Sequence, residues 1–338
     1  AIGNLSGTYH TLNDYPKAFE LGQQALAMRA NTIGKQHPDY ATNLSNLILF
    51  GTQMGSWASI LPLGFDLVET WKNYIMQVFP HLTEKEKVSF YHRVYIETNG
   101  LYQISFQPEG AAIQETVLDF KINTKGLALY ASLDLSRKTS KTNNQILSDI
   151  TRQISQIREE LASLYVAQTQ ESISKQIQQL EKELHKQEKE YQALAIDSGL
   201  SYMNWVSWKE ISQKLPSQSI ALEIIKFFSL NADNQQQFTH YGLVFFTSDW
   251  EKPRFVEIPE GDALEAAFRE RYADSVKTNF KGEDADEEDD FNFLPDEAES
   301  LYELLWGPIA PVVKGYKKLY LSADGIYHEL NPETLFNP

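Results

Sequence analysis

The sequence predicts a multidomain protein in which α-helical repeats and a helical hairpin precede the first part of an α/β unit. Three observations lead to this prediction. An internal repeat lies in the first 80 or so residues, two apolar stripes with helical spacing run through residues 143–196, and short apolar runs typical of strands begin after Trp205. We therefore expect four units: repeats over 1–80, a helical connector over 81–142, an antiparallel hairpin over 143–200 and the α/β unit over 201–338.

The composition limits the classes of function. A chain of 338 residues, 42% of them hydrophobic, is long enough for two or three domains with substantial cores. Its formal charge of −16 argues against nucleic acid as a direct ligand. The absence of cysteine excludes disulfides, thiolate metal sites and a cysteine nucleophile within this sequence. We expect a cytoplasmic protein without a cofactor, metal site or membrane contact, since no apolar run is long enough to cross a bilayer.

The repeat rests on three pairs of packing residues whose numbers differ by 42. These pairs are Leu5 and Leu47, Tyr15 and Trp57, and Ala18 and Ile60. In each unit an apolar helix is followed by a short turn, at residues 12–14 or 54–56, and then by a second helix. A helical hairpin cannot bury its own apolar face, so such units stack on one another. We expect further repeats before Ala1, or a cap formed by the helices after Trp71.

These hairpins resemble the tetratricopeptide repeat in its longer variety, with the segment His37 to Ala41 as the link between two units. The resemblance implies a groove that binds a protein or peptide partner. Asparagine side chains on the first helix of each unit can hydrogen-bond an extended peptide backbone. The candidate partner-binding residues are Asn4, Tyr9, Asn43, Asn46 and Phe50. The alternative is that the asparagines are ordinary solvated positions.

Residues 72–142 predict further helices, one of which ends at the glycine of the segment Glu97 to Gly100. Aromatic residues are dense in this region, and basic residues do not alternate with them as they would in a base-stacking surface. We interpret them as packing between the repeats and the next unit: Phe79, Phe90, Tyr91, Tyr95, Tyr102 and Phe106.

Residues 143–196 predict two antiparallel helices joined by a turn at residues 168–170. The first stripe consists of Ile146, Ile150, Ile157, Leu161 and Leu164, and the second of Ile173, Ile177, Leu180, Leu184, Tyr191 and Leu194. Charged residues between positions 181 and 189 are expected on the wet faces as pairs within one helix, with His185 on the surface. The hairpin is a spacer, a lever or a docking surface.

From Trp205 the pattern changes to that of a sheet. Ser207 and Glu210 predict a capping box that starts a short helix, and runs at 220–228, 240–247 and 254–258 predict strands. The acidic run 283–290 is expected to be a solvated loop, because it lacks the glycine and glutamate spacing of a calcium loop. An amphipathic helix over Leu301 to Ile309 should lead to a strand at 318–322. We expect a hairpin turn at Asp324 and Gly325 that returns residues 326–327 to an extended path, and a helical turn starting at Pro332.

The order of three segments in this region resembles CHAT domains, the caspase-like modules joined to tetratricopeptide repeats in bacterial proteins. The segments are Trp306 to Pro308, Leu321 to Gly325 and Asn331 to Leu335. The resemblance implies a cysteine endopeptidase whose catalytic His and Cys follow the last of these segments. We therefore expect the sequence to stop before the catalytic pair and to hold no catalytic residue of its own.

Two histidines near the strands are not expected to be catalytic. His328 does not match the family's catalytic position, and His240 is expected to be a packed or edge residue. Ser322, Asp324 and His328 could be drawn as a hydrolase triad, but no Gly-x-Ser-x-Gly elbow surrounds Ser322.

The resulting prediction is the regulatory, partner-sensing amino-terminal portion of a tetratricopeptide-repeat CHAT endopeptidase. Its partners would be a protein or peptide on the repeat groove and the carboxy-terminal catalytic half of the same protein. The alternative is a non-catalytic repeat scaffold that only binds protein partners. A His and a Cys at strand ends beyond residue 338 would favour the peptidase.

Overall fold

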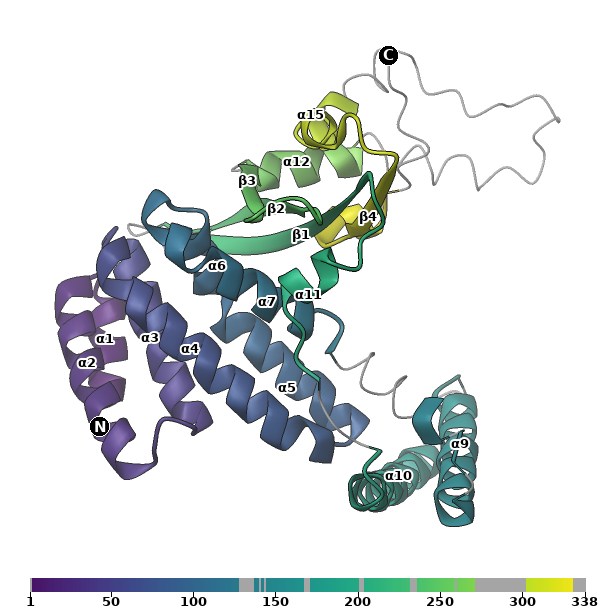
Figure 1. Ribbon diagram of the computed structural model, residues 1–338. Helices are drawn as coiled ribbons and strands as arrows, with labels where there is room; N and C mark the ends of the chain where they lie inside the picture. The colour runs from purple at the N-terminus through teal and green to yellow at the C-terminus, as the bar shows by residue number, and fades with distance from the viewer. Residues whose placement is uncertain are drawn as a thin grey trace.

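A layer of helices covers one face of a four-stranded sheet in the computed structural model (Figure 1). The structure describes residues 2–127, 137–139, 141–142, 144–166, 171–200, 204–231, 236–258, 260–270 and 302–330. Helices α1 to α7 form the covering layer, α12 and α15 lie on the opposite side of the sheet, and the α9–α10 hairpin lies to one side. The order of helical repeats, hairpin and small mixed sheet agrees with the predicted fold class.

The first four helices are two hairpins, as the 42-residue repeat predicts. They are α1 (Ile2–Thr11), α2 (Tyr15–Thr32), α3 (Pro38–Gln53) and α4 (Trp57–Val78). Turns fall at the expected positions, and the Asp14 side chain accepts a hydrogen bond from the Lys17 amide at the start of α2. Most of the paired repeat positions are buried: Tyr15, Ala18, Leu47 and Ile60. The two exceptions are Trp57, which is partly exposed, and Leu5, which has 46% of its surface exposed although its equivalent Leu47 is fully buried against α2.

Short helices continue the layer toward the sheet: η1 (Phe79–His81), α5 (Glu84–Glu97), α6 (Asn99–Ser105), η2 (Pro108–Ala112) and α7 (Gln114–Thr124). The predicted glycine stop is wrong. Helix α5 does end at Glu97, but Gly100 lies inside α6, where the absence of a side chain admits Ile48. A Cβ on Gly100 would lie 2.5 Å from Ile48 Cγ2, so this glycine serves close helix packing.

The predicted hairpin consists of α9 (Gln145–Val166) and α10 (Glu171–Asp197). The helices run antiparallel, since Arg158 pairs with Glu188 while Tyr165, further along α9, bonds to Glu181, which lies earlier on α10. The apolar stripe of α9 is shifted by one residue from the predicted one at its start. Ile146 is 60% exposed, and Leu147 is fully buried instead. The expected turn at 168–170 lies outside the described residues.

The sheet has the strand order β3-β2-β1-β4 and is mixed. Its strands are β1 (Ser219–Leu230), β2 (Gln237–Phe246), β3 (Arg254–Ile258) and β4 (Lys318–Ser322). β1 pairs antiparallel with β2 and parallel with β4, whose Lys318 lies opposite Ser219. All three predicted early strands, the strand at 318–322, and the capping box of α11 (Trp208–Ser212) are confirmed.

Both faces of the central strands are buried. Ile225, Phe227 and Val244 face the helical layer, and one apolar cluster extends from α3 through α4 and α7 to these strands. Ile224 and Leu243 face the other side, where α12 (Gly261–Phe268) and the segment 302–313 cover them. The strands therefore read as nearly continuous apolar runs.

Aromatic packing between the helices and the sheet is confirmed for Phe106. Its ring stacks on Phe227 with centroids 5.3 Å apart and lies against Phe255 at the same distance. Gly242 on β2 leaves room for this ring, because a Cβ there would lie 2.1 Å from Phe106 Cζ. The ring of Phe106, which follows α6, thus packs where Gly242 leaves β2 without a side chain.

The carboxy-terminal segment departs from prediction in two places. The expected helix to Ile309 is interrupted by a turn at residues 306–309 before α15 (Ala310–Val313), because Pro308 lacks the amide that a continuous helix requires. The expected hairpin after β4 is also wrong. Gly325 has a positive φ of 55°, but the chain then forms η4 (Gly325–His328) instead of an extended path. Ile326 and Tyr327 turn inward and are buried beneath the sheet.

Two other predicted segments, the acidic run 283–290 and the helical turn from Pro332, lie outside the described residues.

Candidate functional site

The first candidate surface is formed by the first helix of each repeat. Asn4 on α1 and Asn46 on α3 are both exposed, and their numbers differ by the repeat spacing of 42. Tyr9 is partly exposed. Asn43 is buried and donates a hydrogen bond to the Gly22 carbonyl at 2.9 Å, and Phe50 is buried as well. Asn4, Tyr9 and Asn46 are therefore the accessible members of the predicted set, and the role of all five in partner binding stays a prediction.

A direct contact joins the two first helices. His10 Nε2 lies 2.8 Å from Gln53 Oε1, and the imidazole ring packs on Phe50 with centroids 4.9 Å apart. Asn4 and Asn46 are consequently held on neighbouring helices in a fixed relation. Helix α1 contains no Asp, Glu, Lys or Arg; Leu5 is exposed on it, and Leu12 is exposed in the turn that follows it. The Arg29 guanidinium of α2 lies close to Gly3. The arrangement provides amide and hydroxyl groups together with apolar side chains on a helix that carries no charged side chain of its own.

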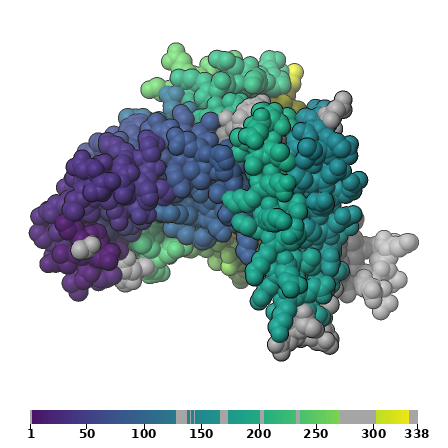
Figure 2. All heavy atoms as spheres, turned by 90° about the horizontal axis from the view of Figure 1, so that it is seen from below, coloured from purple at the N-terminus to yellow at the C-terminus, as the bar shows by residue number. Residues whose placement is uncertain are grey.

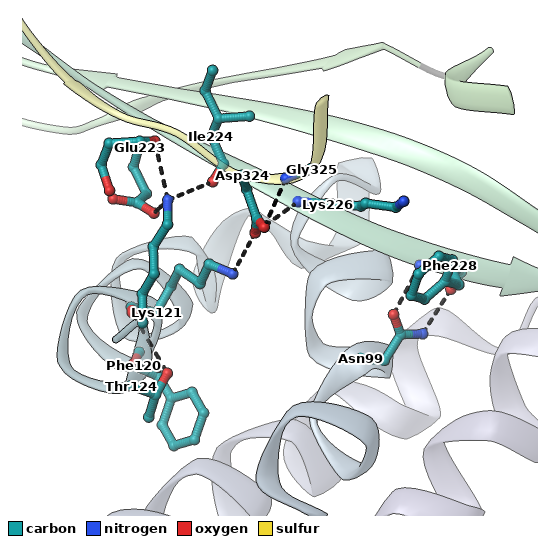
Figure 3. Close-up of polar contacts among 12 residues, drawn as sticks. Asn99, Phe120, Lys121, Thr124, Glu223, Ile224, Lys226, Phe228, Asp324 and Gly325 are labelled. Carbon is teal, nitrogen blue, oxygen red and sulfur yellow. Dashed lines mark hydrogen bonds and ion pairs between the residues drawn. The ribbon is translucent and has the colours of Figure 1, made fainter. Parts of the chain in front are cut away.

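A second candidate region lies between α7 and the edge of the sheet (Figure 3). Lys121 on α7 is 3% exposed, and its Nζ lies 2.8 Å from Asp324 Oδ2, directly after β4. Lys125, which follows α7, lies 2.6 Å from Glu223 Oε1 and donates to the carbonyls of Ile224 and Ser322. Two ammonium groups from the helical layer are thus paired with two carboxylates from the sheet.

The length of β4 explains why polar side chains gather here. β4 pairs with β1 only as far as Glu223, so the outer edge of β1 beyond that residue needs other partners for its backbone groups. Side chains supply them. Lys125 donates to the Ile224 carbonyl, and Asp324 accepts from the Lys226 amide. The Asn99 side chain both accepts from and donates to the backbone of Phe228, at 2.8 and 2.7 Å, as a neighbouring strand would.

Electrostatics keep this cluster ionised. Burial opposes the charge on Asp324, but Lys121 together with Lys125 and the Lys226 amide outweighs it, so the pKa of Asp324 lies below its ordinary value. Burial would likewise lower the pKa of Lys121, yet Tyr102 and Asp324 raise it above its ordinary value. The pKa of Lys125 is lowered, because burial exceeds the opposing effect of Glu223. Burial also raises the pKa of Tyr102 to about 12, which keeps its hydroxyl neutral.

A cavity of about 820 Å³ adjoins the ion pairs. It is bounded by both lysines, both carboxylates, apolar residues of β1 and β4, and the side chains of Tyr91, Ser322 and His328. In the described part of the chain no hydrogen bond joins Ser322, Asp324 and His328 to one another, and Asp324 is held by Lys121. Nor do the described residues contain a group of three or more His, Asp or Glu side chains able to hold a metal ion.

A third polar contact ties the α9–α10 hairpin to the helical layer. Glu188 was expected in a pair within its own helix, but it is buried, where it accepts from Arg158 at 2.7 Å and from the Glu84 amide at the start of α5. Lys189 Nζ lies 2.6 Å from Glu86 on α5, so this residue too forms its ion pair with another helix and not within α10. In the view from below, the blue helices separate the purple first repeat from this teal hairpin (Figure 2). His185 is exposed, as predicted.

The buried ion pairs were missed by the sequence prediction, although one clue was present. Glu223 and Lys226 interrupt the apolar run of β1, and a charge in a strand buried on both faces requires a partner. That partner could not be chosen from sequence, since Lys121 and Lys125 lie about 100 residues away. Asp324 was assigned only a turn role, and His240 is packed as expected, bonded to Ser229 and Glu257.

Comparison with known proteins supports the repeat assignment. The family model of the tetratricopeptide repeat matches residues 1–39, which span α1, α2 and the start of α3. No curated protein matches the chain. In the described part of the chain no helix is both long and apolar enough to cross a membrane. Repeats of this class generally bind other proteins, so the match and the paired hairpins suggest a role in protein interaction.

Proposed function

We propose that the surface of α1 and α3 binds an extended segment of a partner protein. The observation that carries this proposal is the exposure of Asn4 and Asn46 at equivalent positions of two stacked repeats. An extended peptide offers alternating donors and acceptors, and an asparagine amide satisfies one of each. Exposed Leu5 on α1 and Leu12 in the turn after it would bury apolar side chains of the partner. Because α1 carries no lysine, arginine or carboxylate of its own, the surface suits a partly apolar segment of the partner.

The finer part of the proposal assigns the chain to the regulatory portion of a caspase-like cysteine endopeptidase of the CHAT class. Support comes from the order of helical repeats, hairpin and mixed sheet, and from the three segments near the carboxyl end that resemble this class. The four predicted units keep their proposed boundaries at 80, 142 and 200, and the catalytic His and Cys belong to polypeptide beyond residue 338. The proposed location is the cytoplasm.

Binding is tested by selecting peptides from a displayed library against the purified 338-residue chain and measuring the affinity of one selected peptide by fluorescence anisotropy. Asn4→Ala combined with Asn46→Ala should weaken binding about 30-fold or more, since at least one hydrogen bond of about 1 kcal/mol is lost at each asparagine. Gln23→Ala is the matched control, because Gln23 is an exposed amide on the second helix α2. Unchanged affinity in the double variant would refute the proposed surface.

The peptidase assignment is tested with the polypeptide that the complete gene encodes. Cleavage of the bound partner, followed by mass spectrometry and abolished by substituting the predicted cysteine, would support the endopeptidase. Binding without cleavage would support the scaffold alternative. Because the two assays are separate, loss of the peptidase assignment leaves the binding surface intact.

A further inference from the structure

The segment directly after β4 is held from both sides of the sheet. We call residues Asp324 to His328 the post-β4 loop. On the side of the helices, Lys121 pairs with Asp324, whose carboxylate also accepts from the amides of Lys226 and Gly325. Asp324 thereby joins α7, β1 and the loop through one side chain (Figure 3). A displacement of α7 cannot leave this carboxylate behind without breaking a buried ion pair.

On the opposite face the loop meets a second polar chain. The Ile326 amide donates to the Tyr241 hydroxyl at 3.1 Å, and that hydroxyl donates to Glu265 Oε1 on α12 at 2.8 Å. Lys226, whose amide contacts Asp324, places its ammonium against the same Glu265. The contacts form a continuous route from α7, through the post-β4 loop, to α12 on the far side of the sheet.

The post-β4 loop packs closely against Tyr241 at the centre of this route. Gly325 adopts a φ of 55°, and a Cβ there would lie 2.1 Å from the Tyr241 hydroxyl oxygen. The loop therefore follows the tyrosine closely. On the side of the helices, by contrast, the cavity of about 820 Å³ leaves space beside Lys121 and Asp324. The loop is packed against Tyr241 on the far face of the sheet and borders the cavity on the side of the helices. It can therefore move with the helices without displacing packed side chains on that side.

The repeats reach α7 through apolar packing. Gly64 on α4 lies so close to Ile113, the residue before α7, that a Cβ would be 2.8 Å from Ile113 Cδ1. Val117 and Leu118 of α7 are fully buried in the cluster that also contains Leu67 and Trp71 of α4. A displacement in the second repeat therefore reaches the start of α7, about two turns before Lys121.

We propose that Lys121 is a positioning residue that carries displacements of the helical layer to the post-β4 loop and on to α12. This inference rests on the proposed function and deepens it, because it names the path by which partner binding on the repeats alters the α/β unit. The ion pair suits this task better than apolar contacts would. Separating it leaves a buried charge without a partner, which is strongly unfavourable, so helix and loop move as one unit.

Hydrogen–deuterium exchange on the 338-residue chain tests the coupling without any partner. Lys121→Met retains the apolar stem and removes the charge, and it should speed exchange in the post-β4 loop and in α12 about tenfold. Lys17→Met is the matched control, since Lys17 forms an exposed pair with Glu20 on α2. Faster exchange confined to α7, or none at all, would overturn the proposal.

A second variant covers the case in which Lys121→Met unfolds the chain. Asp324→Asn keeps the size of the side chain and can still accept from the amides of Lys226 and Gly325. Because coupling is reciprocal, this change in the loop should speed exchange in α7, and unchanged exchange there would refute the inference. Gly64→Ala, which displaces Ile113, should alter loop exchange in the native background and not with Lys121→Met.

These outcomes separate the two proposals. The exchange assay needs no peptide, so a failed peptide selection would remove the proposed function while the coupling is still measured. If the double asparagine variant loses binding but the loop and α7 exchange independently, the binding surface stands and the coupling falls.

Discussion

Asn99→Ala tests whether a helix side chain replaces a missing strand at the edge of β1. In the native structure the Asn99 amide accepts from the Phe228 amide at 2.8 Å and donates to the Phe228 carbonyl at 2.7 Å. Gln103 also donates to that carbonyl, so the carbonyl keeps a partner in the variant. The Phe228 amide loses its acceptor in a partly buried position, which destabilises this region by about 2 kcal/mol.

The assay is hydrogen–deuterium exchange in peptides that cover residues 224–230, supported by thermal unfolding. A loss of about 2 kcal/mol corresponds to about 30-fold faster exchange when local opening controls the rate. Asn73→Ala is the matched control, because Asn73 lies on α4 and makes one exposed hydrogen bond to Glu69. Exchange within threefold of native in Asn99→Ala would refute the view that this side chain completes the edge of the sheet.

Three other perturbations follow from contacts in the described chain. Gly22→Val should lower the thermal midpoint, since a Cβ at Gly22 would lie 2.7 Å from Leu47 Cδ2. Overpacking of this kind costs about 1–3 kcal/mol. An unchanged midpoint in calorimetry would contradict the close packing of α2 against α3. Glu188→Ala should weaken the attachment of the α9–α10 hairpin to α5, where only the contacts of Lys189 with Glu86 and the His81 carbonyl would remain of the polar contacts named here, and should speed limited proteolysis of the hairpin ahead of the repeats. The pKa of Asp324 is depressed because Lys121, Lys125 and the Lys226 amide together outweigh burial, so its stabilisation is present above about pH 4 and is lost as the pH falls through the folded-state pKa. Thermal midpoints between about pH 5 and 2 should therefore fall less steeply in Lys121→Met than in the native chain.

Local patterns were sufficient for most of the secondary structure. The 42-residue repeat, the capping box at Ser207 and the three early strands depend on residues that are near one another in sequence, and each was found in the structure. Helix phase was less certain. Ile146 and Leu147 both suit an apolar stripe, and only the tertiary structure decides that Leu147 is the buried residue. Adjacent apolar residues give no local reason to prefer one phase over the other.

The candidate site was only partly within reach of sequence. Equivalent asparagines could be placed on first helices, but the burial of Asn43 follows from its hydrogen bond to the Gly22 carbonyl of another helix. For Glu188 the prediction was exposure and the structure shows burial. Its charge was expected in solvent, paired with neighbours on its own helix. It is instead buried against the start of α5, because the amides there need a hydrogen-bond acceptor.

By itself the sequence determined the repeat class and the positions of most helices and strands, because these depend on residue spacing along the chain. Tertiary structure alone decided that β4 lies parallel beside β1 and ends at Glu223. That early end leaves the edge of β1 open, and the open edge draws in Asn99, Lys125 and Asp324 from distant parts of the chain. Partners about 100 residues apart or more are selected by where the backbone brings unsatisfied groups together, which no local pattern records.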